Sequence, residues 1–188
     1  MLSEYLISTN AQKVLQFLLL CSGKKCYERE IARGTKISYG SANKVLNQLY
    51  KKGLVNRKNE GRMCYYSIDT SNPYIKDFKA LNNLLLIEPL VEKLKTCSRK
   101  IVLYGSWAEG LDSETSDIDI FIVSSDQDKV KSIINKFSSS QKAANRKIQA
   151  VIAAPADLLN QDEREKVFNK QLEQGKLLWE KEINEDNL

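Results

Sequence analysis

Residues 100–123 read KIVLYGSWAEGLDSETSDIDIFIV, and this stretch decides the fold of the C-terminal half of the chain. A short apolar run ends in Gly105-Ser106, and ten residues later Asp117-x-Asp119 opens a second apolar run. Short apolar runs bounded by glycine and polar residues are typical of buried β-strands. The stretch therefore predicts two strands joined by a loop that begins with a Gly-Ser turn.

The residue types at this loop point to phosphate and metal chemistry. Gly105 at a strand end lets the chain turn sharply with its N–H groups exposed, and Ser106 adds a hydroxyl, which suits phosphate oxygens. Because successive side chains of a strand point to opposite faces, Asp117 and Asp119 are expected on one face. Two carboxylates this close repel each other unless a cation lies between them. Mg2+, which combines a few carboxylates with substrate phosphates, is the expected ion.

This stretch resembles the signature of the nucleotidyltransferase superfamily typified by DNA polymerase beta. It is most similar to the minimal nucleotidyltransferase branch, in which a bare catalytic domain is often paired with a helical toxin partner. The resemblance covers residues 99–180, down to a Gly-x-x-Leu-aromatic ending that begins at Gly175. It implies that the Gly-Ser turn binds a nucleoside triphosphate, with ATP the expected one. It also implies that Asp117 and Asp119 are catalytic and bind magnesium while an attacking hydroxyl displaces pyrophosphate.

One position departs from the family pattern, which usually has a third carboxylate on a later strand. The candidate strand 147–152 reads KIQAVI and places Gln149 at the expected position of that carboxylate. An amide oxygen binds a metal weakly and is a poor base for a hydroxyl. Either Glu109, Asp112 or Asp157 substitutes, or the domain binds nucleotide and transfers slowly or not at all. We favour the hypothesis of impaired or unconventional transfer over full polymerase-like catalysis, and whether the protein is an active enzyme is left as an alternative.

The sequence of the N-terminal third predicts three helices followed by a hairpin. Apolar residues at helical spacing predict a first helix that begins at Thr9 or Asn10, then a short helix before Gly34. A longer helix follows, with Ser38 as its N-cap and Gly53 at its end. Two strand-favouring segments, 54–58 and 63–68, then flank a turn signal at 59–61. Over residues 9–69 this order resembles a winged helix-turn-helix domain, as found in many bacterial and archaeal regulators.

Such a domain is expected to bind double-stranded DNA through its second helix and wing. Asn and Gln side chains can bond an adenine edge, whereas Lys and Arg contact phosphates. The polar residues off the apolar stripe that we expect to contact DNA are Lys36, Tyr39, Ser41, Asn43, Lys44, Gln48, Lys51, Lys52, Arg57, Lys58 and Arg62. The alternative is a solvated basic face on a domain that contacts only protein.

Composition narrows the chemistry further. None of the 188 residues is histidine, which excludes a Ser-His-Asp triad, a Cys-His pair and a His-bound zinc. The net charge of +5 is uneven, because residues 1–72 hold 12 Lys and Arg against 5 Asp and Glu. The basic face therefore belongs to the N-terminal third.

The four cysteines are scattered, with no C-x-x-C pair, which favours reduced thiols. With no apolar run long enough for a membrane span and no visible signal peptide, we expect a cytoplasmic protein.

The sequence thus predicts an α+β protein of two domains. We expect a winged helix-turn-helix domain at 1–72, a helical connector at 73–97, and a nucleotidyltransferase domain at 98–188, whose mixed β-sheet is covered by helices. The connector is expected to kink or divide at Pro89, and its extra apolar residues to serve domain packing or, alternatively, a homodimer. The leading hypothesis is a DNA-binding regulator with a magnesium-dependent nucleotide site, which can transfer a nucleotidyl group to a protein or small molecule. The alternatives are an antitoxin-like protein that neutralises a helical toxin and an RNA-directed nucleotidyltransferase.

Overall fold

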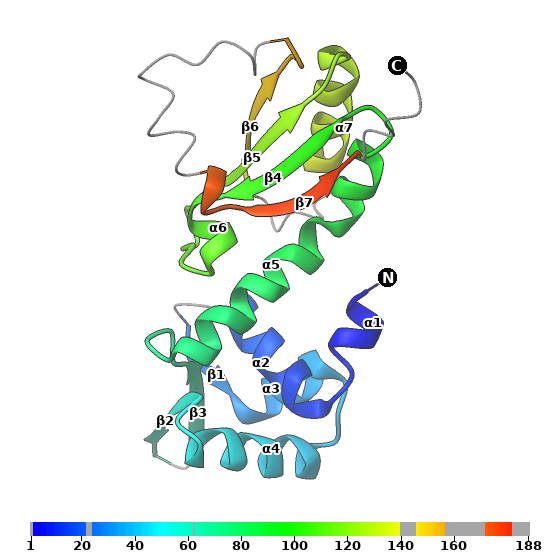
Figure 1. Cartoon of the computed structure of the whole chain (residues 1–188). Coiled ribbons are helices and arrows are strands. Elements are labelled where there is room, and N and C mark those ends of the chain that lie inside the picture. Colours follow the sequence, from blue (N-terminus) through cyan, green and yellow to red (C-terminus); the bar gives the residue numbers. More distant parts are fainter. Residues whose placement is uncertain (1, 22–23, 62, 140–145, 157–171, 182–188) are drawn as a thin grey trace. The chain divides into compact units, whose positions relative to one another are not determined.

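The computed structural model describes residues 2–21, 24–61, 63–139, 146–156 and 172–181. The chain forms two compact units, Met1–Leu85 and Leu86–Leu188. The predicted α+β class is confirmed, since each unit combines helices with a β-sheet (Figure 1). Among the helices of the described ranges, none has both the length and the apolar character to span a bilayer.

The first unit has the helix and strand order of a winged helix-turn-helix. Its elements are α1 (Ser3–Leu6), α2 (Asn10–Leu20), β1 (Cys26–Tyr27), α3 (Glu28–Thr35), α4 (Tyr39–Lys51), β2 (Val55–Glu60) and β3 (Met63–Ile68). The three strands form an antiparallel sheet in the order β1-β3-β2 (Figure 1). The hairpin of β2 and β3 is the wing, and α4 is the helix expected to read DNA.

One hydrophobic core holds this unit together. It takes fully buried side chains from each of the three main helices, including Val14 of α2, Ile31 of α3 and Leu46 of α4. Burying each of these side chains contributes about 1.5–3 kcal/mol. Ile75, at the start of α5 (Pro73–Leu94), belongs to the same core. The first residues of α5 are therefore part of the winged-helix unit.

Side-chain caps define where the helices of this unit begin. The Thr9 hydroxyl accepts a hydrogen bond from the Gln12 N–H at 3.2 Å, and Gln12 Oε1 accepts one from the Thr9 N–H at 2.9 Å. This reciprocal pair is a capping box and fixes the start of α2. Ser38 Oγ accepts from the Ser41 N–H at 3.2 Å and caps α4, as the sequence predicts.

The second unit is built on a four-stranded mixed sheet. Its elements are β4 (Lys100–Tyr104), α6 (Gly105–Glu109), β5 (Ile118–Val123), α7 (Gln127–Ser139), β6 (Ile148–Ala153) and β7 (Lys176–Glu180). The strand order is β6-β5-β4-β7, with β5 and β6 parallel and the other pairs antiparallel. In Figure 1 α7 lies along one face of the sheet.

Strand alternation divides the sheet residues between two faces. Val102, Tyr104, Phe121 and Val123 lie on one face and form a buried cluster. Ile120, on the opposite face, is fully buried as well. Both central strands are thus covered on both sides, which explains why their sequences are nearly continuous apolar runs.

Some expectations about element boundaries are wrong. Pro89 lies inside α5, which runs as one helix from Pro73 to Leu94, so the expected alternative of two consecutive helices is wrong. Gly34 does not end α3; a Cβ there would lie 2.0 Å from the Phe17 ring, so this glycine allows α2 and α3 to pack closely. Asn59 and Glu60, expected in the turn, are the last residues of β2.

Other predictions fall on residues outside the described ranges. Arg62 of the wing and Asp157, a candidate third carboxylate, are two of these. Most of residues 156–174, a segment whose sequence also predicts a helix that covers the sheet, lies there.

Candidate functional site

The sheet brings two side chains of the predicted nucleotide site, Asp119 and Gln149, into one row with Tyr104. Tyr104 at the end of β4 pairs with Asp119 of β5, and Asp119 pairs with Gln149 of β6. Paired residues of neighbouring strands project from the same face. Gln149 is therefore the cross-strand neighbour of Asp119, on the face that also carries the Gly-Ser turn.

Gly105 is required at this position by two independent features of the backbone. Its φ is +69°, which lies in the left-handed region that favours glycine. An ideal Cβ built on Gly105 would also lie 2.7 Å from Oδ2 of Asp119, well inside van der Waals contact. The turn after β4 thus passes directly against the Asp119 carboxylate. Ser106 follows within α6 and is half-buried.

The electrostatics of Asp119 favour a bound cation. Burial, and then the negative charge of Asp117, raise the pKa of Asp119 above its ordinary value. The pKa of Tyr104 is also raised, by burial and then by the Asp119 charge. Concentrated negative charge of this kind is relieved when a divalent cation binds between the carboxylates. The donor set of two aspartates beside a Gly-Ser turn fits Mg2+ together with phosphate oxygens.

A third carboxylate does not join this pair within the part of the chain that the structure describes. No group of three or more Asp, Glu, Cys or His side chains gathers there to hold a metal. Glu109 is exposed at the end of α6, and Asp112 is buried after it. Neither replaces the carboxylate that Gln149 lacks, and Asp157 lies outside the described ranges.

Two basic residues, Arg146 and Lys147, immediately precede β6 and were not among the predicted residues. The Arg146 guanidinium donates to the Ser113 carbonyl in the loop before β5. The Lys147 carbonyl accepts from the Ile118 N–H at 2.8 Å, so the backbone of Lys147 runs beside the start of β5. Lys147 and Gln149 alternate with Ile148 along the chain, but only the long-range pairing of β5 with β6 brings this segment to the site, so the sequence pattern did not indicate Lys147.

The winged-helix unit presents most of the predicted DNA-contacting residues on its surface. The exposed ones are Lys36, Tyr39, Lys44, Gln48, Lys51, Lys52, Arg57 and Lys58, whereas Ser41 and Asn43 are half-buried. Lys36, with φ +57°, ends α3 in the left-handed conformation. Exposed lysine and arginine side chains therefore follow one another from α4 into β2, and this part of the chain is rich in positive charge.

Several of these side chains already have partners within the domain. Asn47 Nδ2 donates to Asn43 Oδ1 at 3.0 Å, and Asn47 Oδ1 accepts from Arg57 Nη1 at 3.3 Å. Arg57 Nε also donates to Cys64 Sγ at 2.9 Å. Asn47 was not singled out from the sequence, yet it joins the recognition helix to the wing and orients Arg57.

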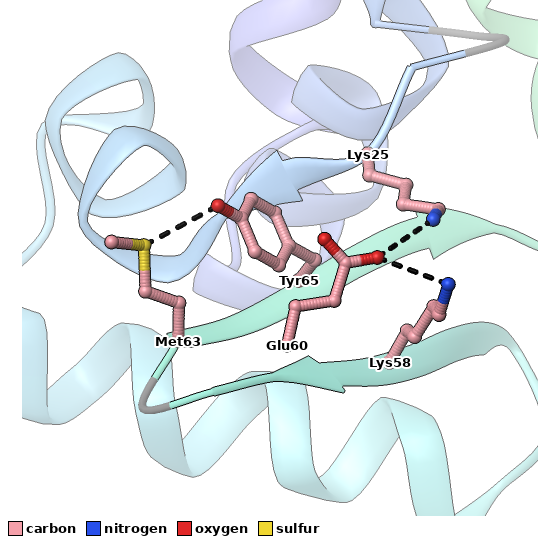
Figure 2. Close-up of polar contacts among 5 residues, drawn as sticks. All are labelled: Lys25, Lys58, Glu60, Met63 and Tyr65. Atoms are coloured by element: carbon pink, nitrogen blue, oxygen red, sulfur yellow. Dashed lines mark hydrogen bonds and ion pairs between the residues drawn. The ribbon is translucent and has the colours of Figure 1, made fainter.

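The wing carries a small ion-pair group centred on Glu60, shown in Figure 2. Glu60 Oε1 lies 3.0 Å from Lys25 Nζ and 3.1 Å from Lys58 Nζ. These lysines hold the pKa of Glu60 below its ordinary value, and Glu60 raises the pKa of Lys58. On the next strand the Tyr65 hydroxyl donates to Met63 Sδ at 3.3 Å (Figure 2). Lys58 is therefore partly neutralised, and Lys25 adds a cation that the sequence reasoning missed.

Tyr39 at the start of α4 is held by the preceding helix. Its hydroxyl donates to Glu28 Oε2 at 3.2 Å, and Arg29 lies 5.9 Å from the centre of its ring. The pKa of Tyr39 is raised chiefly by the negative charge of Glu28. Glu28 is buried, and this contact fixes the side chain that begins the recognition helix.

Comparison with protein families gives one match in each part of the chain. Residues 87–184 match the family described as "Polymerase beta, Nucleotidyltransferase", and the chain belongs to this family. Residues 2–71 match "Sugar-specific transcriptional regulator TrmB". The predicted joining of a winged-helix regulator domain to a nucleotidyltransferase domain is confirmed.

Solved structures with similarity to the chain include three proteins. Sso10a-2, a DNA-binding protein from Sulfolobus solfataricus, is 30% identical over 44% of this chain and 93% of its own, with a TM-score of 0.29. Lactococcus lactis ZitR, a zinc-responsive MarR family member, is 14% identical over 74% and 81%, with a TM-score of 0.36. TrmBL2, an archaeal chromatin protein, is 14% identical over 89% and 72%, with a TM-score of 0.32. Comparison with curated proteins gave no match.

Proposed function

We propose that this protein is a DNA-binding transcription regulator whose nucleotidyltransferase domain binds a nucleoside triphosphate together with Mg2+. The observation that carries the nucleotide half is the 2.7 Å separation between a Cβ on Gly105 and Oδ2 of Asp119. A backbone turn this close to a carboxylate brings phosphate-binding N–H groups and a metal ligand to one place. The domain's family membership supports the same assignment.

Each residue of the nucleotide site has a distinct role in this proposal. Gly105 and Ser106 bind phosphate oxygens through backbone N–H groups and the serine hydroxyl. Asp117 and Asp119 hold the cation. When bound, Mg2+ neutralises the phosphates and polarises the α-phosphorus. Lys147 adds positive charge at the same edge of the sheet and favours the polyphosphate over a neutral ligand.

The DNA half of the proposal rests on α4 and the wing. Gln48 and Lys44 are exposed on α4, where they can meet base edges in a major groove. Lys51 and Lys52 at the helix end and Arg57 on the wing supply phosphate contacts. The match of residues 2–71 to a transcriptional regulator family supports this role.

Nucleotide binding is tested by equilibrium dialysis with radiolabelled ATP, GTP, CTP and UTP, with and without Mg2+. We expect the wild-type protein to retain at least one of these nucleotides in a magnesium-dependent manner. Asp117→Ala and Asp119→Ala should lose this binding, whereas Asp128→Ala, which removes an exposed carboxylate of α7, should retain it. Equal retention by all four proteins, or by none, would refute the nucleotide assignment.

DNA binding is tested by titrating duplex DNA and RNA of the same sequence across a salt series. We expect a preference for duplex DNA and an affinity that falls as salt rises, because phosphate contacts release counterions. Lys51→Ala combined with Lys52→Ala should reduce the salt slope by about 2 if each lysine neutralises one phosphate. Lys129→Ala combined with Lys131→Ala, which removes two exposed lysines of α7, serves as the matched control. A clear preference for RNA would replace the regulator proposal with an RNA-directed one.

A further inference from the structure

We infer that Gln149 makes the nucleotide site a one-cation site, which holds a nucleoside triphosphate intact instead of transferring its nucleotidyl group. This inference rests on the proposed binding of a magnesium nucleotide and specifies what that binding does. According to this inference, the nucleotidyltransferase domain acts as a nucleotide receptor attached to a DNA-binding domain.

The first step is the register of the parallel strands β5 and β6. Asp119 and Gln149 are direct partners, and neighbouring strands of a sheet lie about 4.8 Å apart. A carboxylate at position 149 would therefore share metal ions with Asp119. The side chain at that position is an exposed, neutral amide.

The second step is the set of metal-binding groups on this face. The Ile118 N–H donates to the Lys147 carbonyl at 2.8 Å, which belongs to the pairing of Ile118 with Ile148 and fixes Gln149 beside Asp119. Asp117 and Asp119 supply two carboxylates, and within the described residues no third carboxylate joins them. A second cation beside Gln149 would find only a neutral amide oxygen as an additional ligand.

The third step is the proton balance of transfer. In nucleotidyl transfer a hydroxyl oxygen forms a bond to the α-phosphorus while the bond from that phosphorus to the α,β-bridging oxygen breaks. Pyrophosphate leaves with that bonding pair, and the hydroxyl proton passes to a base. Gln149 cannot accept this proton. Glu109 and Asp112, the other candidate bases in the described residues, do not gather with the aspartate pair.

The experiment counts the cations bound with one nucleotide. Wild-type protein is titrated with Mn2+ in the presence of an ATP analogue that cannot be cleaved between the α- and β-phosphates, and bound Mn2+ is followed by electron paramagnetic resonance. We expect one Mn2+ per bound nucleotide. Gln149→Asp should bind two, with the broadened signal of a spin-coupled pair, whereas Gln149→Asn, the neutral control, should bind one.

The fate of the nucleotide provides a second measurement. ATP bound to the wild-type protein with Mg2+ should be recovered unchanged, without release of pyrophosphate. Two Mn2+ per nucleotide in the wild type, one in Gln149→Asp, or pyrophosphate release by the wild type would each overturn the inference. If the wild-type protein binds no nucleotide, the proposed nucleotide function itself fails. The two failures can be told apart in the wild-type protein. Absence of nucleotide binding refutes the proposed function, whereas bound nucleotide with two Mn2+ ions refutes only this inference.

Discussion

Gly105 and Asp119 lie so close that an ideal Cβ on the glycine would come within 2.7 Å of the aspartate Oδ2. The two residues come from different elements, the turn after β4 and the strand β5. In the proposed site, this close approach joins the turn assigned to phosphate with the carboxylate assigned to the cation. The position of Asp119 therefore depends on the absence of a side chain at position 105.

Gly105→Ala should abolish most nucleotide binding while destabilising the protein only modestly. The new methyl group can be accommodated if the Asp119 carboxylate rotates away, which removes a cation ligand. The left-handed φ costs about 1–2 kcal/mol for a non-glycine residue. Gly53→Ala is the matched control, because Gly53 has φ +68° and open space around its Cα. Both variants should lose similar unfolding free energy in urea, but only Gly105→Ala should bind nucleotide more weakly. Equal nucleotide affinity in the two variants would contradict the proposed contact.

Gly34→Ala should destabilise the winged-helix unit by about 1–3 kcal/mol, the usual cost of overpacking a core. The added Cβ would lie 2.0 Å from Cε2 of Phe17, which packs against the core. Gly40, in α4, has nothing within 4 Å of an added Cβ and provides the control. Chemical denaturation followed by circular dichroism should show loss for Gly34→Ala and none for Gly40→Ala. A similar stability of both variants would show that α2 and α3 can separate at no cost.

Ser38→Ala should remove the N-cap of α4 and cost about 1 kcal/mol of unfolding free energy. The Ser41 N–H, which donates to Ser38 Oγ at 3.2 Å, would lose its protein partner. Ser38→Asp should retain most of the stability, since aspartate is an equally good cap and complements the helix dipole. Thermal unfolding should give a lower midpoint temperature for Ser38→Ala than for the wild type and Ser38→Asp. Equal losses in the two variants would show that Ser38 does not stabilise the protein as an N-cap.

The winged-helix unit should become less stable in alkaline solution. Burial, and then the neighbouring Cys21 thiol, raise the pKa of Cys26 from 9.0 to about 12. The neutral thiol is thus favoured in the folded state, and this stability is present below the unfolded pKa and is lost as pH rises toward the folded value. Unfolding free energy measured in urea should fall as pH increases from 9 toward 12. The fall should be smaller in Cys26→Ala and unchanged in Cys97→Ala; the same slope in all three would exclude Cys26 as its source.

Much of this fold was predictable because local signals agreed with tertiary packing. Ser38 and Thr9 are strong N-caps, and the strand 100–104 is bounded by lysine and glycine. The predicted helix boundaries were wrong where a residue that usually ends a helix instead lies in a tightly packed part of the structure. Gly34 reads as a helix stop, but its missing side chain makes room for Phe17. Pro89 reads as a break, but the surrounding apolar residues are buried along one continuous helix.

The candidate site was predictable to a similar degree. Residue types, their spacing and the family resemblance indicated Gly105, Asp117 and Asp119. Gly105 directly follows β4, and the two aspartates lie at the start of β5. The position of Gln149 beside Asp119 requires the β5–β6 register, which depends on a long-range parallel pairing that no local pattern encodes. Lys147 was missed for the same reason.

The central claim is that one cation and one nucleotide meet at Asp117 and Asp119, with none at Gln149. A crystal structure of the protein with Mn2+ and a non-hydrolysable ATP analogue tests it most directly, because anomalous scattering locates each manganese ion. The predicted result is one manganese ion bound by both aspartates, with phosphates on the Gly105-Ser106 turn. A second manganese ion beside Gln149, or a nucleotide bound away from this turn, would contradict the account.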